Sequence, residues 1–106
     1  MKAWLKFTGT LLDGAHVRAE VGPEHIPLAG RIASAHAADQ YHVPDRDSLR
    51  AVGALISSWD LVNDAGPIGL SPHVLTDVLP ANFAIVVYLT WALATLEVRP
   101  TRIDLN

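Results

Sequence analysis

Five histidines are the side chains of this sequence best suited to acid–base or metal chemistry, and they stand at positions 16, 25, 36, 42 and 73. Metal sites on helices use ligand pairs about three or four residues apart. The closest pair here, His36 and His42, is six residues apart in a segment without clear periodicity. The sequence has no cysteine, so thiolate ligands and disulfides are excluded. We therefore predict no metal site and no cofactor, and we interpret the histidines as solvated loop residues.

Nucleophilic catalysis would need a serine held next to a base, and the candidate serines do not fit that role. Ser57 and Ser58 lie inside a helix-like pattern, and neither is flanked by the glycines of a nucleophile elbow. The acidic pair Asp45 and Asp47 precedes a helical pattern, where carboxylates complement the helix dipole. The glycines are isolated and form no phosphate-binding loop. We predict that the protein is not an enzyme and has no catalytic residues.

Length and composition narrow the class of protein further. The 106 residues are 50% apolar and 18% charged, which favours a single folded domain over residues 1–106. A net charge of −3 provides no basic surface for nucleic acid. The segment 1–9 has too few apolar residues for a signal peptide, and the lack of cysteine fits a reducing cytosol. We expect a soluble cytoplasmic protein that does not bind nucleic acid.

The first half of the chain, residues 1–44, has the pattern of a small antiparallel sheet. Residues 3–8 are rich in strand-forming side chains, and an Asp-Gly turn separates them from an alternating strand at 16–21. The inward face of that strand would carry Val17, Ala19 and Val21. Residues 26–33 are interpreted as a third strand, which Pro27 places at an edge of the sheet. Residues 34–44 are predicted to be a loop.

The second half, residues 45–98, has helical spacing. Asp45 or Asp47 can cap a helix whose apolar stripe is Leu49, Val52, Ile56 and Trp59. A turn at 63–67, a short helix that begins at 71 and stops at Pro80, and a last helix over 81–97 follow. Residues 99–106 form a short tail. The predicted fold is therefore α+β, with an N-terminal β-hairpin or small antiparallel sheet followed by three helices, the last strongly apolar.

The last predicted helix is apolar on nearly every side, because only Asn82, Thr90 and Thr95 interrupt residues 81–96. Its 16 residues would reach ~24 Å. That is less than the ~30 Å of a bilayer core, so we do not expect it to span a membrane. Such a helix must be covered on most sides. It is either the central core helix or a surface for a partner or a second copy, and we expect a homo-oligomer. Large aromatic and aliphatic side chains are favoured anchors, and the expected partner-binding residues are Phe83, Val86, Val87, Tyr88 and Trp91.

The run of residues 56–71 resembles a signature of the tail assembly chaperones of long-tailed (siphovirus-type) phages and prophages. In that family a helix ends in a Ser-Trp-Asn/Asp-Leu motif, and an Asp-Gly turn follows. A Pro-Leu-Thr/Ser motif then begins a short helix, which is followed by a final apolar helix. The corresponding residues here are Trp59-Asp60-Leu61, Asp64-Ala65-Gly66, Leu70-Ser71, Leu79-Pro80 and the helix from Ala81. The resemblance covers about half the chain, and the turn departs from the pattern by its inserted alanine.

The resemblance implies a chaperone that coats the apolar, helical tape-measure protein until tail-tube subunits assemble around it in the bacterial cytoplasm. An alternative is a structural tail or virion component, because residues 8–14 are also reminiscent of small β modules in phage minor tail proteins. A further alternative is a membrane-active or inhibitory protein that uses the last helix as an interfacial anchor. We expect a tape-measure or tail-tube protein as partner, and no membrane.

Overall fold

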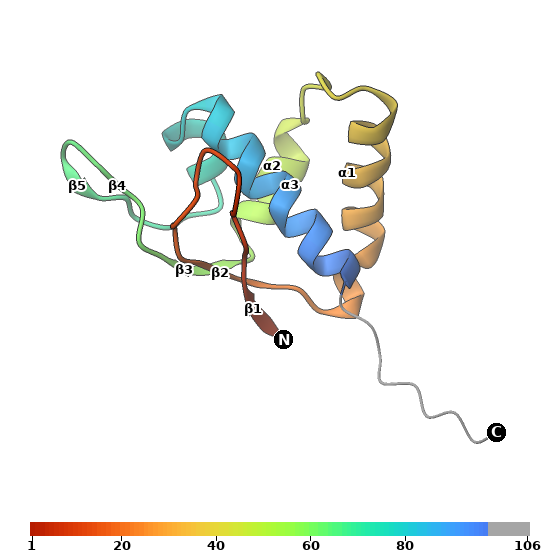
Figure 1. The fold of residues 1–106 in the computed structure, drawn as a ribbon, viewed down its shortest axis with the longest axis horizontal. Coiled ribbons are helices and arrows are strands. Elements are labelled where there is room, and N and C mark those ends of the chain that lie inside the picture. The colour runs from red at the N-terminus through yellow and green to blue at the C-terminus, as the bar shows by residue number, and fades with distance from the viewer. Residues whose placement is uncertain (98–106) are drawn as a thin grey trace.

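The computed structural model describes residues 1–97, and the short tail expected at 99–106 lies outside them. Within these residues the chain is an α+β fold with a three-stranded sheet and three helices of eight or more residues (Figure 1). The sheet contains β1 (Lys2–Trp4), β2 (Val17–Glu20) and β3 (Ile56–Trp59), and the helices are α1 (Ile26–Ala38), α2 (Arg46–Gly53) and α3 (Ala81–Glu97). The remaining elements are a 3-10 helix η1 (Pro23–His25), a π-helical turn η2 (Val74–Val78), and a hairpin of β4 (Val62–Asn63) and β5 (Gly66–Pro67).

The sheet is antiparallel, with β2 between β1 and β3. Ala3 pairs with Ala19, and Trp4 pairs with Arg18. The predicted alternation of the second strand is confirmed, because Val17, Ala19 and Val21 are completely buried while Arg18 is exposed. Successive side chains of a strand point to opposite faces. One face of the sheet therefore joins the core, and the other carries Trp4 and Arg18 towards solvent.

Residues 26–33 are not the predicted edge strand but the first part of α1, which continues through residues 34–38 of the predicted loop. Pro27 lies in the first turn of the helix. A backbone N–H in that turn has no partner within the helix, so the missing N–H of proline costs little there. Ala29 and Ile32, three residues apart, are the buried positions of α1. The proline therefore marks a helix start rather than a sheet edge.

The long helix predicted from Asp45 ends at Gly53, and Ile56–Trp59 forms β3 instead. The N-cap prediction holds, because the Asp45 carboxylate accepts a hydrogen bond of 3.0 Å from the backbone N–H of Ser48. Beyond the helix, Ile56 is buried against β2 while Ser57 is exposed. Pairing with β2 satisfies the backbone groups of this segment, and the helical spacing of its apolar residues could not reveal that distant pairing.

Helix α3 has the predicted bounds and crosses the middle of the molecule with α1 beside it (Figure 1). Its C-terminal half is hydrogen-bonded to the end of β2 through Trp91. The turn predicted at 63–67 is the β4–β5 hairpin, in which Gly66 adopts a positive φ of 116° as expected. The hairpin extends away from the body of the molecule (Figure 1). None of the helices in the described part is long and apolar enough to cross a membrane.

Candidate protein-binding surface

The five residues of α3 expected to bind a partner differ in burial. Val87 and Trp91 are completely buried within this chain, and Tyr88 is 4% exposed. Phe83 and Val86 are partly exposed. The structure therefore divides the expected set: three members belong to the core of a single copy, and two remain accessible at the surface.

Trp91 shows how the inner face of α3 is fixed. Its indole N–H donates a hydrogen bond of 2.7 Å to the backbone carbonyl of Glu20 at the end of β2. The ring of His25 packs edge-on against the indole, with centroids 6.2 Å apart. A buried tryptophan normally has a partner for its N–H. Trp91 therefore ties α3 to the sheet and to the turn that precedes α1.

The outer face of α3 is also apolar. Val86, Leu89 and Leu93 lie three and four residues apart, so they line one side of the helix. Leu93 is 60% exposed, and α3 has no charged residue before Glu97. We call Val86, Leu89 and Leu93 the α3 ridge. A surface helix normally presents polar side chains to water, whereas here Leu93 is exposed and Val86 and Leu89 are partly exposed.

Two grooves run along the ridge and share Leu93. The α1–α3 groove has a volume of about 290 Å³ and is lined by Ala33, His36, Ala37, Leu89, Ala92 and Leu93. The β1–α3 groove, on the other side, has a volume of about 470 Å³. Its lining combines apolar residues with three threonines and two charged residues of opposite sign: Ala3, Trp4, Lys6, Thr8, Thr10, Thr90, Leu93, Ala94 and Glu97. The alanines of α1 leave room beside the ridge. A groove of this kind can accept the apolar face of a helix.

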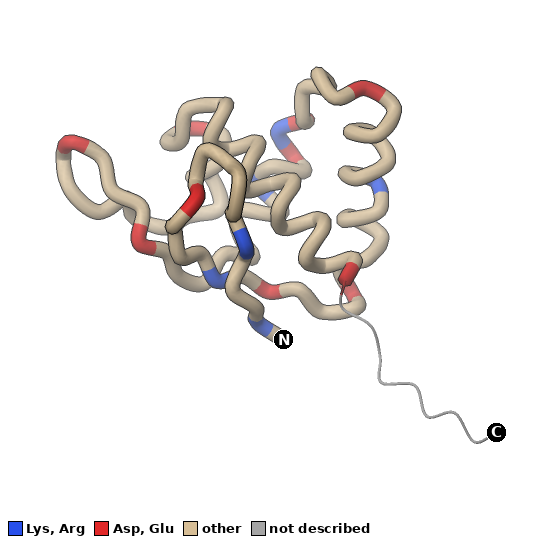
Figure 2. The backbone as a smooth tube through the Cα atoms, in the orientation of Figure 1, with Lys and Arg blue, Asp and Glu red and all other residues tan. Residues whose placement is uncertain are grey.

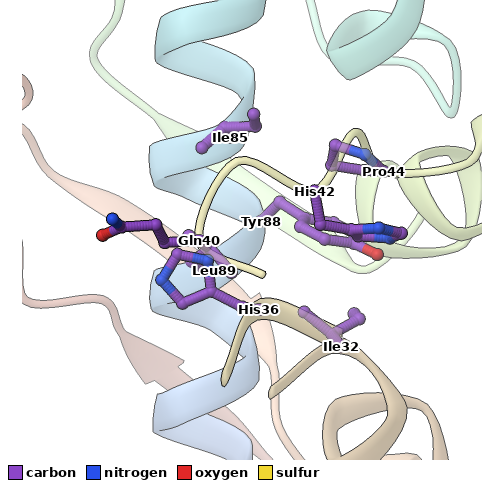
Figure 3. Close-up of a pocket in the computed structure, with 8 residues that line it drawn as sticks. All are labelled: Ile32, His36, Gln40, His42, Pro44, Ile85, Tyr88 and Leu89. Atoms are coloured by element: carbon purple, nitrogen blue, oxygen red, sulfur yellow. The ribbon is translucent and has the colours of Figure 1, made fainter. Parts of the chain in front are cut away.

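The pair His36 and His42 lies at a small cavity between α1, the following loop and α3 (Figure 3). The cavity has a volume of about 20 Å³, enough for about one water molecule. Tyr88 forms part of its wall, and burial raises the pKa of this tyrosine, which therefore stays neutral at physiological pH. No group of three or more metal-ligating side chains occurs in residues 1–97. The cavity is too small for a substrate, and its residues do not form a metal centre.

A second polar cluster, between His16 and Asp60, was not anticipated. The imidazole Nδ1 and a carboxylate oxygen are 2.7 Å apart, and the backbone N–H of His16 donates to the other carboxylate oxygen at 2.8 Å. The hydrogen bonds from His16 hold the pKa of Asp60 below its ordinary value. The hydroxyl of nearby Ser57 donates to the carbonyl of Arg18. The pair therefore fixes the backbone where the β4–β5 hairpin begins. No sequence motif predicts this pair, because its two residues are 44 positions apart.

Comparison with known proteins adds no relative: no family model, no curated protein and no solved structure matches this chain.

Proposed function

We propose that this protein is a non-enzymatic tail assembly chaperone of a long-tailed phage or prophage, and that it acts in the cytoplasm of the bacterial host. In this proposal the α3 ridge binds an apolar helical segment of the tape-measure protein. The exposed Leu93, which lies between two grooves and has the partly buried Val86 and Leu89 on the same side of α3, is the observation that carries the proposal. The resemblance of residues 56–71 to this family supports the choice of partner.

The chemistry of the ridge favours an apolar helix as the bound element. Leu93 is exposed between the two grooves, and Ala33 and Ala37 on α1 permit close approach. A partner helix with apolar residues at helical spacing would cover the ridge and remove its apolar side chains from water. The chain itself carries a net charge of −3, which favours solubility of a complex with an apolar partner.

The proposal is tested by co-expression with the tape-measure protein encoded in the same phage or prophage. The wild-type chain should raise the soluble fraction of the tape-measure protein and co-purify with it. Leu93→Glu should remove this effect, because burying an unpaired carboxylate in an apolar interface costs several kcal/mol. Ala37→Glu should weaken the solubilising effect without removing it, because Ala37 lines only the α1–α3 groove.

A matched control is Leu11→Glu. Leu11 is 62% exposed, close to the 60% of Leu93, but it lines neither groove. This variant should keep the wild-type effect. If the tape-measure protein remains soluble with Leu93→Glu, the ridge is not its binding surface. If the wild-type chain has no effect on it, the chaperone function itself is wrong.

The alternative function, a structural tail component, is favoured by one feature, the hairpin that extends away from the body (Figure 1). Subunits of assemblies commonly use such extensions to contact their neighbours. Mass spectrometry of purified particles separates the two functions: many copies per particle indicate a building block, and absence indicates a chaperone.

A further inference from the structure

A separate cleft lies where α1, the loop that follows it, the start of α2 and α3 meet. Its volume is about 190 Å³, and it adjoins the small cavity of Figure 3, because the two share Ile32, His42 and Tyr88. None of its lining residues belongs to either groove beside the α3 ridge. We call it the Tyr88 cleft. Its lining includes Arg31, Ile32 and Ala35 of α1, Asp45 and Ser48 at the start of α2, and Tyr88 of α3.

Tyr88 brings a buried polar group to this cleft. The residue is only 4% exposed, and none of the side-chain hydrogen bonds formed within residues 1–97 involves its hydroxyl. Burial raises the pKa of Tyr88, and the next contributions come from Ser48, which lowers it, and Asp45, which raises it. Because these two residues line the cleft, the hydroxyl lies at its wall. Buried polar groups normally have hydrogen-bond partners, so a ligand in the cleft can supply the missing one.

The cleft also carries one positive and one negative side chain that are not in contact. Arg31 and Asp45 form no ion pair with each other or with any other residue in the described part of the chain. The pKa of Asp45 is lowered first by its hydrogen bonds with Ser48 and, in smaller part, by the charge of Arg31. The two charges are therefore close enough to interact but too far apart to bind each other. Figure 2 shows the basic position on α1 and the acidic positions at the start of α2.

The charges and the size of the cleft select the chemical class of its ligand. A simple anion would be repelled by Asp45 and a simple cation by Arg31, whereas a molecule with one charge of each sign can satisfy both. An apolar cavity of about 150 Å³ holds benzene, which has about six non-hydrogen atoms. A cleft of about 190 Å³ therefore admits a small amino acid such as alanine. Ile32 and Ala35 offer apolar surface for its side chain.

We propose that the Tyr88 cleft binds a small α-amino acid as a zwitterion. Arg31 and the Tyr88 hydroxyl donate hydrogen bonds to its carboxylate, and Asp45 accepts one from its ammonium group. Hydrogen bonds between charged groups are about twice as strong as those between neutral groups, and an arginine can hold a carboxylate with two parallel bonds. This inference goes beyond the proposed function, because it does not require the tape-measure protein and uses no residue of the α3 ridge.

Titration with three molecules of nearly equal size, followed by NMR of the backbone amides, tests the site. L-Alanine carries both charges, isobutyrate has a methyl group in place of the ammonium, and alaninamide has a neutral amide in place of the carboxylate. L-Alanine should cause saturable shifts of the Ala35 and Ser48 amides, which belong to the cleft. Isobutyrate and alaninamide should each bind about tenfold more weakly, because each loses a hydrogen bond between charged groups.

Three variants assign the two ends of the ligand. Asp45→Asn removes the charge but keeps a side chain that can cap α2, and it should abolish the preference for alanine over isobutyrate. Arg31→Gln should abolish the preference for alanine over alaninamide. Tyr88→Phe keeps the buried ring and loses only the hydroxyl, so it should weaken alanine binding about tenfold. Circular dichroism should show an intact fold for all three.

Arg18→Gln is the matched control for Arg31→Gln, because it removes the same charge from the outer face of the sheet, outside the cleft. It should bind alanine as the wild type does. The site is overturned if alanine causes no saturable shift, if isobutyrate or alaninamide binds as tightly as alanine, or if the charge variants keep the wild-type preferences. Leu93→Glu, which tests the tape-measure surface, should leave alanine binding unchanged, so the two proposals can fail separately.

Discussion

Replacing Trp91 with alanine should unfold the protein rather than only remove a binding surface. The side chain is completely buried, and its indole N–H donates to the carbonyl of Glu20 at 2.7 Å. Truncating a buried tryptophan costs about 3–5 kcal/mol, and the carbonyl that loses its donor adds about 1 kcal/mol. A domain of this size has a total free energy of unfolding of about 5–15 kcal/mol. Trp91→Ala therefore removes a large part of the stability.

Urea unfolding followed by circular dichroism measures this loss directly. For a domain of this size, each kcal/mol lowers the melting temperature by about 4–8 °C. The melting temperature of Trp91→Ala should therefore fall by at least about 15 °C. The matched control is Leu93→Ala on the same helix, which should change the free energy of unfolding by less than about 1 kcal/mol because Leu93 is 60% exposed. If Trp91→Ala keeps the wild-type urea midpoint but loses a partner, Trp91 is an interface residue and its assignment to the core is wrong.

Three further predictions concern the close contact between Gly53 and Pro72, the base of the β4–β5 hairpin, and the loss of stability at acid pH. Gly53→Ala would place a Cβ 2.7 Å from the carbonyl oxygen of Pro72, so the backbone must shift. The free energy of unfolding should fall by about 1–3 kcal/mol, measured by thermal denaturation. An unchanged melting temperature would contradict this close contact. Trp59→Phe removes the hydrogen bond to the carbonyl of Ile68, so amide hydrogen exchange should quicken across residues 61–68 while α3 stays protected. Exchange rates across 61–68 equal to those of the wild type would show that this bond does not hold the β4–β5 hairpin. The pKa of Asp60 is lowered from its ordinary value of 3.8, first by the backbone N–H of His16 and then by its ring, so its contribution to stability is present above pH 3.8 and is lost as the pH falls further. Asp60→Asn should make the decline below pH 3.8 shallower, and an identical acid titration of stability would refute this role.

Local signals in the sequence identified several elements correctly. The apolar run between Pro80 and Glu97 defined α3, because proline disfavours helical conformation in the residue before it and a continuous apolar segment of this length favours a helix. The alternation around Val17 and Ala19 identified the central strand and its buried face. The N-cap at Asp45 and the positive φ of Gly66 followed from side-chain chemistry within a few residues. All of these depend on neighbours along the chain.

Tertiary structure decided what depends on distant partners. Residues 56–59 have helical spacing, yet they form β3 because β2 offers backbone partners about 40 residues away in the sequence. Pro27 is compatible with both an edge strand and the first turn of a helix, and packing of α1 against α3 selects the helix. The pairing of His16 with Asp60 likewise exists only once β2 and the end of β3 are side by side.

The sequence by itself determined that α3 is apolar on nearly every side, so that most of its surface must be covered. It could not determine which side is covered within one copy, because Val86, Val87 and Tyr88 are consecutive apolar residues on different faces of the helix. The answer depends on which elements pack against α3, namely α1, α2, η2 and the end of β2. Val87, Tyr88 and Trp91 are buried in this arrangement, and Leu93 remains exposed. An amphipathic pattern identifies a buried face from the sequence alone, whereas a helix that is apolar all round has its buried face chosen by the elements that fold onto it.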